Sequence, residues 1–138
     1  MKKKLNCVLL VDDDESTNFL HELIIKQAGV TEKVIAEQSG ASALEYLRSK
    51  SDGAYPQPDL IFLDINMPGM NGWEFLEEYK KLDKGQQGKF VVVMLTTSLH
   101  PEDEEKAQGM AEIDDFKNKP LTVDMLHEVI EKNFSEYL

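Results

Sequence analysis

The chain has 138 residues, a net charge of −11 at pH 7 and 41% hydrophobic residues, which suits one domain with a real core. The excess of acids argues against nucleic-acid binding, because phosphate contacts need clustered Lys and Arg. The apolar runs are too short to span a bilayer or to form the apolar region of a signal peptide. The single cysteine, Cys7, cannot form an internal disulfide, so we expect a cytoplasmic protein with Cys7 buried in the first strand.

The first third of the chain alternates between apolar runs and helical periodicity. Strands are predicted at 7–11 and 34–36, and helices at 15–28 and 41–48. The first strand ends abruptly in a run of four acids, 12–15. In the first helix, the apolar face that we expect to be buried consists of Phe19, Leu20, Leu23, Ile24 and Ala28. In the second helix, Ala43, Leu44 and Leu47 are expected to point inward.

The middle of the chain carries a third strand at 60–63, a short apolar run without alternation. Such a run is covered on both faces, which favours a parallel sheet flanked by helices. It stops at Asp64, and the Asn, Pro and Gly residues of 66–72 then predict a loop. An isolated Asp in this place would be read simply as a solvated strand cap.

The second half continues the alternation. A helix is predicted at 71–82, a strand at 90–95, a helix beginning near Pro101, a weak strand at 113–117 and a helix capped by Thr122. The buried face of that last helix is expected to consist of Met125, Leu126, Val129, Ile130 and Phe134. The three histidines, His21, His100 and His127, are scattered and are interpreted as surface or helix-end residues.

Five strand–helix alternations predict an α/β fold with a doubly wound, five-stranded parallel sheet, flavodoxin-like and flanked by five helices. In the strand order 2-1-3-4-5, the reversal lies between strands one and three, where ligands bind beyond the strand ends. This order would bring Asp12, Asp13 and Asp64 into one crevice, with Thr96 and Lys119 at the neighbouring strand ends. We expect one domain, 1–138, without an output domain.

The candidate site offers only oxygen ligands, and three close carboxylates repel one another unless a cation joins them. An oxygen-only site with few protein ligands suits Mg²⁺, which keeps several waters and shares them with phosphate. An Asp carboxylate can act as the nucleophile that forms an aspartyl phosphate. In that chemistry the Lys119 ammonium would neutralise phosphoryl oxygens and the Thr96 hydroxyl would donate a hydrogen bond.

With these residues, the chain resembles the receiver domain of two-component response regulators, of the stand-alone type similar to chemotaxis regulators. The resemblance covers essentially the whole chain. It rests on Asp12 and Asp13 after the first strand, the segment 64–72, Thr96 after the fourth strand, and Lys119 with Pro120 after the fifth. The 2-1-3-4-5 order is known for this family, so the resemblance also carries that expectation.

The resemblance implies a role for each matching residue. Asp64 is the phosphoacceptor, and Asp13, Asp64 and the backbone carbonyl of Asn66 bind Mg²⁺ directly, while Asp12 acts mainly through water. Thr96 is the switch hydroxyl, Lys119 contacts the phosphoryl group and Phe116 is the switch aromatic. The phosphoryl donor is a histidine kinase or a phosphotransfer protein, and an unidentified downstream protein binds helix four, strand five and helix five.

Three features depart from the family pattern. Asp14 and Glu15 add two carboxylates beside Asp12 and Asp13, and an extra carboxylate there would either compete for the metal or only cap the first helix. Thr97 stands where a small residue is common, and the segment 110–115 lacks a common Gly-Ala pair.

Two alternatives remain open at this point. The first is a Mg²⁺-dependent phosphatase of the haloacid-dehalogenase type, which also uses a strand-end Asp nucleophile. In such enzymes the nucleophile belongs to an Asp-x-Asp motif at the first strand, whereas the candidate nucleophile here follows the third strand. The second is a degenerate receiver that binds a partner without phosphorylation, against which the intact acids, Thr96 and Lys119 argue. The main prediction is a phosphorylation-activated signalling switch that is not an enzyme.

Overall fold

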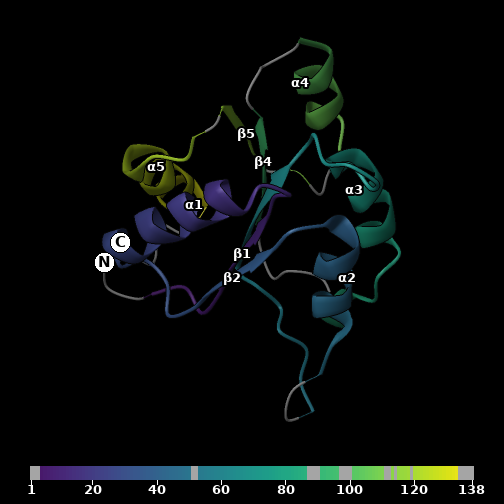
Figure 1. Cartoon of the computed structure of the whole chain (residues 1–138), viewed down its shortest axis with the longest axis horizontal. Helices are drawn as coiled ribbons and strands as arrows, with labels where there is room; N and C mark the ends of the chain where they lie inside the picture. Colours follow the sequence, from purple (N-terminus) through teal and green to yellow (C-terminus); the bar gives the residue numbers. More distant parts are fainter. Residues whose placement is uncertain are drawn as a thin grey trace.

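A computed structural model describes residues 4–50, 53–86, 91–96, 101–110, 113, 115–118 and 120–133. Its centre is a five-stranded parallel sheet with the order β2-β1-β3-β4-β5, which confirms the predicted topology (Figure 1). The strands are β1 (Val8–Val11), β2 (Val34–Glu37), β3 (Leu60–Asp64), β4 (Val91–Thr96) and β5 (Asp115–Asn118). The fifth strand thus begins two residues later than the weak apolar signal at Ile113 predicted.

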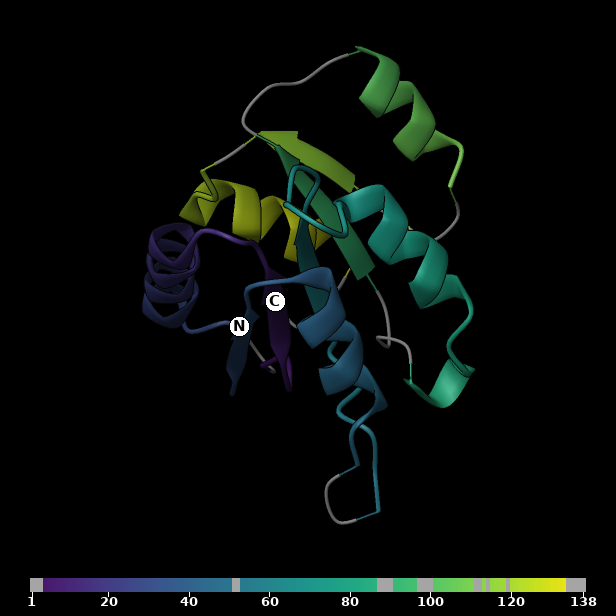
Figure 2. The same ribbon diagram turned by 45° about the vertical axis from the view of Figure 1, so that its right-hand side comes forward.

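Helices cover both faces of the sheet. They are α1 (Glu15–Ala28), α2 (Gly40–Arg48), α3 (Gly72–Lys80), α4 (Pro101–Gln108) and α5 (Val123–Asn133), with a 3-10 turn, η1, at Lys84–Gln86. Figure 2 shows α1 and α5 together on one side of the sheet, with α2 and α3 on the other. The predicted helix at 71–82 ends at Lys80, although Leu82 beyond it is still buried.

The core is divided by the sheet into two apolar layers. Val8 and Leu10 of β1 point into the layer under α1 and α5, whereas Leu9 and Val11 point into the layer under α2 and α3. This alternation follows from the two-residue period of a strand and explains why the run at 7–11 is apolar on both faces. Ala43, Leu44 and Leu47 of α2 are buried as predicted.

Short polar segments begin and end the helices. Gly29 takes a left-handed conformation, with φ of 66°, at the end of α1. The side chain of Asn71 accepts a hydrogen bond from the backbone N–H of Glu74, whose carboxylate in turn accepts from the backbone N–H of Asn71. Thr122 Oγ1 accepts a hydrogen bond from the backbone N–H of Met125 at 3.1 Å, which confirms Thr122 as the cap of α5.

The predicted buried face of α1 is only partly right: Ala28 is half-buried against the core, as predicted, but three of the other predicted residues are exposed. Phe19, Leu20 and Leu23 are 64%, 45% and 41% exposed. The residues that α1 buries are instead Asn18, His21 and Ile25. These positions also share one helical face, and the two polar side chains are accommodated there because each forms a hydrogen bond with buried backbone.

The interpretation of His21 as a surface residue is therefore also wrong, since it is 2% exposed. His127 on α5 is exposed as predicted. His100 and Phe134 lie outside the described residues. Cys7 is buried, as predicted, although it lies one residue before the start of β1.

Candidate functional site

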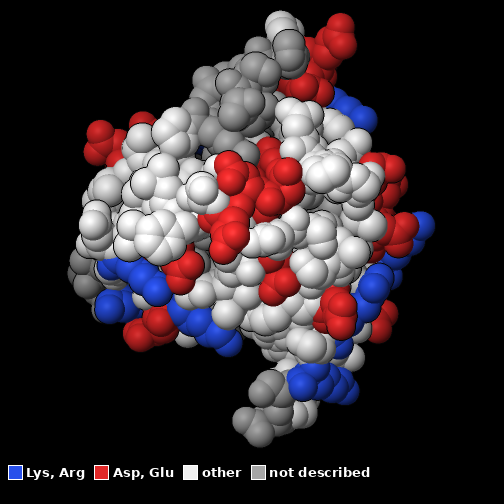
Figure 3. All heavy atoms as spheres, in the orientation of Figure 1, with Lys and Arg blue, Asp and Glu red and all other residues white. Residues whose placement is uncertain are grey.

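Three aspartates meet at the carboxyl ends of β1 and β3. One carboxylate oxygen from each of Asp12, Asp13 and Asp64 lies within 4.8 Å of the other two. The parallel pairing of Val11 with Leu63 causes this proximity, because the residues after Val11 then lie beside the end of β3. Asp12 and Asp64 are 4% and 5% exposed, whereas Asp13 is open to solvent. Figure 3 shows acidic side chains gathered in the middle of this face.

Backbone and side-chain donors orient two of the three acids. Asp12 Oδ1 accepts from the backbone N–H of Asp14 at 2.9 Å, and the Asp12 carbonyl accepts from Asn18 Nδ2 at 2.8 Å. Asp64 Oδ1 accepts a weaker hydrogen bond from the backbone N–H of Asn66 at 3.3 Å. The loop after β1 is thereby held to α1 through Asn18, and the Asp64 carboxylate is oriented by the turn that follows β3.

Asp14 serves as the cap of α1. Its Oδ1 accepts from the backbone N–H of Ser16 at 3.0 Å and its Oδ2 from the hydroxyl of Thr17 at 2.8 Å. Both carboxylate oxygens thus contact the first turn of the helix, which favours the capping role over competition for a metal. Asp14 is not part of the three-residue cluster of potential metal ligands.

The remaining predicted site residues are only partly described. Thr96 is the last residue of β4, and the pairing of Asp64 with Leu95 brings it to the same edge of the sheet as the acids. The side chain of Thr96 and the whole of Lys119 lie outside the described part of the chain. Asn66 is exposed, two residues beyond Asp64. Phe116 lies on β5 opposite Met94, half-buried against the core layer under α2 and α3.

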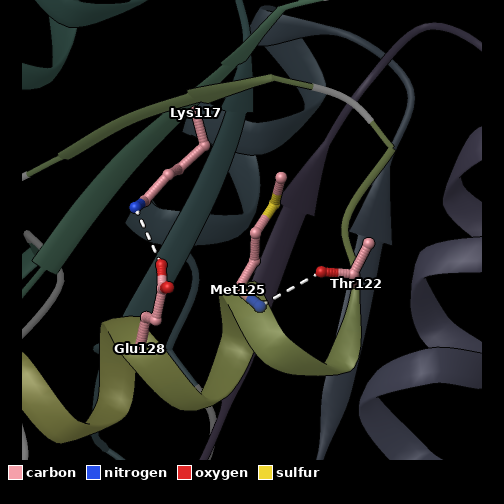
Figure 4. A network of polar contacts seen from close by, with 4 residues as sticks. All are labelled: Lys117, Thr122, Met125 and Glu128. Atoms are coloured by element: carbon pink, nitrogen blue, oxygen red, sulfur yellow. Dashed lines mark hydrogen bonds and ion pairs between the residues drawn. The ribbon is translucent and has the colours of Figure 1, made fainter.

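Lys117, the residue before Asn118, forms an ion pair with α5. Lys117 Nζ lies 3.2 Å from Glu128 Oε2, so that this ion pair joins β5 to α5 (Figure 4). In the same view, Thr122 contacts the backbone of Met125. Lys117 therefore extends toward α5, which leaves Lys119 as the basic candidate for the end of β5.

The donor set fits Mg²⁺. All three ligand atoms are carboxylate oxygens, which are the hard donors that this ion prefers, and the exposure of Asp13 leaves room for the waters that Mg²⁺ retains.

Sequence reasoning missed Asn18 and His21. Asn18 holds the loop of Asp12, and His21 Nε2 accepts the backbone N–H of Leu121 at 3.2 Å. Their spacing with Ile25 at positions i, i+3 and i+7 was a signal, but the more apolar stripe next to it competed with it.

The fold and the acids together define the class. The doubly wound parallel sheet carries a cluster of three acids at the point where its strand order reverses, which is where α/β proteins of this kind bind ligands. A family model for the response regulator receiver domain matches residues 8–131. The chain belongs to the response regulator receiver family.

Individual relatives agree with this assignment. The crystal structure of a two-component response regulator from Cytophaga hutchinsonii superposes with a TM-score of 0.82 at 35% identity, covering 94% of this chain and 97% of that one. The probable methanogenesis regulatory protein FilR2 of Methanothrix harundinacea is 28% identical over 91% of this chain and 79% of its own length. The sensor histidine kinase GacS of Pseudomonas protegens is 26% identical over 91% of this chain, which spans 13% of that kinase.

Membership confirms, at the level of the family, the prediction of a phosphorylation-activated signalling switch. Receiver domains are phosphorylation-activated switches of two-component systems, they bind Mg²⁺ at an acidic pocket, and they interact with histidine kinases or phosphotransfer proteins. The haloacid-dehalogenase alternative receives no support. The absence of an output domain and the cytoplasmic location remain predictions. Among the described residues, no helix is long and apolar enough to cross a membrane.

Proposed function

We propose that this chain accepts a phosphoryl group on Asp64 from a histidine kinase or a phosphotransfer protein. The proposal depends on one observation: carboxylate oxygens of Asp12, Asp13 and Asp64 lie within 4.8 Å of one another at the strand ends. Asp13, Asp64 and the backbone carbonyl of Asn66 would hold Mg²⁺, and Asp12 would act mainly through water. The bound ion would neutralise charge on the phosphoryl oxygens.

The transfer needs little beyond positioning and charge neutralisation. A carboxylate oxygen of Asp64 forms a bond to phosphorus while the bond from phosphorus to the donor imidazole nitrogen breaks. The nitrogen keeps the electron pair and leaves as neutral imidazole once it is protonated. Lys119 neutralises a phosphoryl oxygen, and the Thr96 hydroxyl donates a hydrogen bond to another. The chain itself acts as the acceptor in a signalling step, which is why we do not class it as an enzyme.

The exposed apolar side chains of α1 suit the donor. Phe19, Leu20 and Leu23 are large, apolar and at least 41% exposed, and α1 begins beside the acids. A partner that brings a phosphohistidine to Asp64 must cover this region, and such contacts would bury apolar area. We propose α1 as the surface that contacts the donor.

The downstream partner is proposed to bind α4, β5 and α5. Phosphorylation of Asp64 would draw the Thr96 hydroxyl toward the phosphoryl group, and Phe116 would move into the space behind β4. The first turn of α4 contains Glu102, Asp103 and Glu104, which favours a protein partner with a basic patch and disfavours nucleic acid.

A phosphorylation assay distinguishes the proposal from its alternatives. The protein is incubated with Mg²⁺ and acetyl phosphate, and phosphate release is followed together with the fluorescence of Trp73. One equivalent of acid-labile phosphate per chain with a matching fluorescence change supports the receiver function. Continued turnover of varied phosphate esters would indicate a phosphatase, and the absence of any incorporation would indicate a degenerate receiver.

A further inference from the structure

Helix α1 carries two buried polar side chains on the face that packs against the sheet. Asn18 and His21 are 4% and 2% exposed, and they lie one helical turn apart. Ile25, one further turn along, is apolar and fully buried. The buried stripe of α1 is therefore polar at the end next to the acids and apolar at the other end.

Each of these side chains holds the backbone of a different loop. Asn18 Nδ2 donates to the carbonyl of Asp12 at 2.8 Å, in the loop after β1. His21 Nε2 accepts from the backbone N–H of Leu121 at 3.2 Å, in the turn between β5 and α5. The two loops are about a hundred residues apart in sequence, so α1 connects opposite ends of the chain.

Burial of the His21 imidazole has a desolvation cost. An apolar side chain of similar volume would extend the apolar layer under α1 and α5 without the desolvation that a polar ring requires. The hydrogen bond to Leu121 compensates for this cost, and it also fixes one backbone position between β5 and α5. Because Nε2 accepts, the proton of the neutral ring is assigned to Nδ1.

Leu121 follows Lys119 by two residues, and Asn118, the last residue of β5, precedes Lys119 by one. Two described residues on either side of Lys119 are therefore held: Asn118 by its pairing with Thr96, and Leu121 by His21. We propose that His21 is a positioning residue for Lys119: it places the turn after β5 relative to the Asp12 loop, which Asn18 holds from the same helix. This inference rests on the proposed phosphorylation of Asp64.

The test compares His21→Leu, which removes the acceptor, with His21→Gln, whose side-chain carbonyl oxygen can accept the same N–H. His127→Leu and His127→Gln on the exposed face of α5 are matched controls. Two quantities are measured on the full chain: amide hydrogen exchange at Leu121, normalised to Leu9 and Leu10 of β1, and the rate of phosphorylation by acetyl phosphate at saturating Mg²⁺.

In His21→Leu, we expect exchange at Leu121 to rise by about tenfold, the change that corresponds to loss of one hydrogen bond. The phosphorylation rate should fall by a similar factor while the affinity for Mg²⁺ stays within about twofold of wild type, because the acids are held by other contacts. His21→Gln should restore both quantities, and both His127 variants should match wild type.

Three outcomes would overturn the inference. Unchanged exchange at Leu121 in His21→Leu would show that the hydrogen bond does not hold the turn. Faster exchange with an unchanged phosphorylation rate would show that the turn does not position Lys119. If His21→Gln shows the same exchange at Leu121 and the same phosphorylation rate as His21→Leu, the imidazole ring acts only by filling space. If wild type accepts no phosphoryl group, the proposed function fails, and the positioning role fails with it even if the exchange result confirms the contact.

Discussion

The ammonium group of Lys106 on α4 lies 4.6 Å from the centre of the Trp73 ring on α3. This cation–π contact joins the two helices beside the site, and an exposed contact of this kind contributes about 0.5–1 kcal/mol. It also makes Trp73 a reporter of the position of α4, since movement of α4 changes the environment of the indole.

We predict that Lys106→Met alters the fluorescence of Trp73 and lowers Tm by no more than about 4 °C, as expected for loss of one exposed contact in a domain of this size. Lys84→Met on η1 serves as the control and should change neither quantity. Unaltered Trp73 fluorescence in Lys106→Met would contradict the contact.

Asp13→Asn should raise the stability of the metal-free protein. Removal of one carboxylate from the cluster relieves like-charge repulsion of about 1 kcal/mol in a water-exposed position, equivalent to a rise in Tm of about 3 °C. Addition of Mg²⁺ should stabilise wild type, by about 2.7 kcal/mol at a hundredfold excess over Kd, and should stabilise the variant much less. Thermal unfolding with EDTA and with Mg²⁺ measures both effects. A large fall in the Tm of metal-free Asp13→Asn would mean that Asp13 is structural.

Stability should decline at alkaline pH through Cys7 and Tyr46. Burial raises the pKa of the Cys7 thiol above its ordinary value of 9.0 and is also the main cause of the raised pKa of the Tyr46 hydroxyl, which lies 3.8 Å from Cys7 Sγ. The folded state thus favours the neutral forms. Their stabilising contribution is complete below about pH 9 and is lost as the pH rises through the folded values.

Tyr46→Phe should therefore flatten the fall in the free energy of unfolding above pH 10, as measured by urea denaturation at several pH values. Tyr55→Phe is the matched control. Parallel alkaline profiles for wild type and Tyr46→Phe would show that Tyr46 does not contribute.

Phe116 is expected to respond to phosphorylation through Thr96. The ring is half-buried against the layer under α2 and α3, and as a Phe it has no hydroxyl to hold it outward. We expect beryllofluoride with Mg²⁺ to shift the NMR signals of the Phe116 ring and of α4 in wild type, and to leave them unshifted in Thr96→Ala. Equal shifts in Thr96→Ala would mean that the signal reaches this surface without Thr96.

Much of this architecture could be predicted from the sequence, because apolar runs ending in polar residues fix both the strands and the edge at which ligands bind. Asp12, Asp13 and Asp64 were predicted to meet because strand order alone brings them together. The buried face of α1 was predicted correctly for Ala28 and wrongly for Phe19, Leu20 and Leu23, which form the more apolar stripe. Asn18 and His21 share the i, i+3, i+7 spacing with Ile25, but their burial depends on hydrogen bonds to the Asp12 carbonyl and the Leu121 backbone N–H, and the second partner lies a hundred residues away in sequence.

The location of the phosphoryl group tests the central claim most directly. The protein is treated with Mg²⁺ and acetyl phosphate, the acyl phosphate is trapped by borohydride reduction, and the modified residue is identified by mass spectrometry. We predict modification at Asp64 in wild type and in the control Asp83→Asn, and none in Asp64→Asn or without Mg²⁺. Modification of Asp64→Asn to the extent of wild type, on any other residue, would contradict the assignment of Asp64 as the phosphoacceptor.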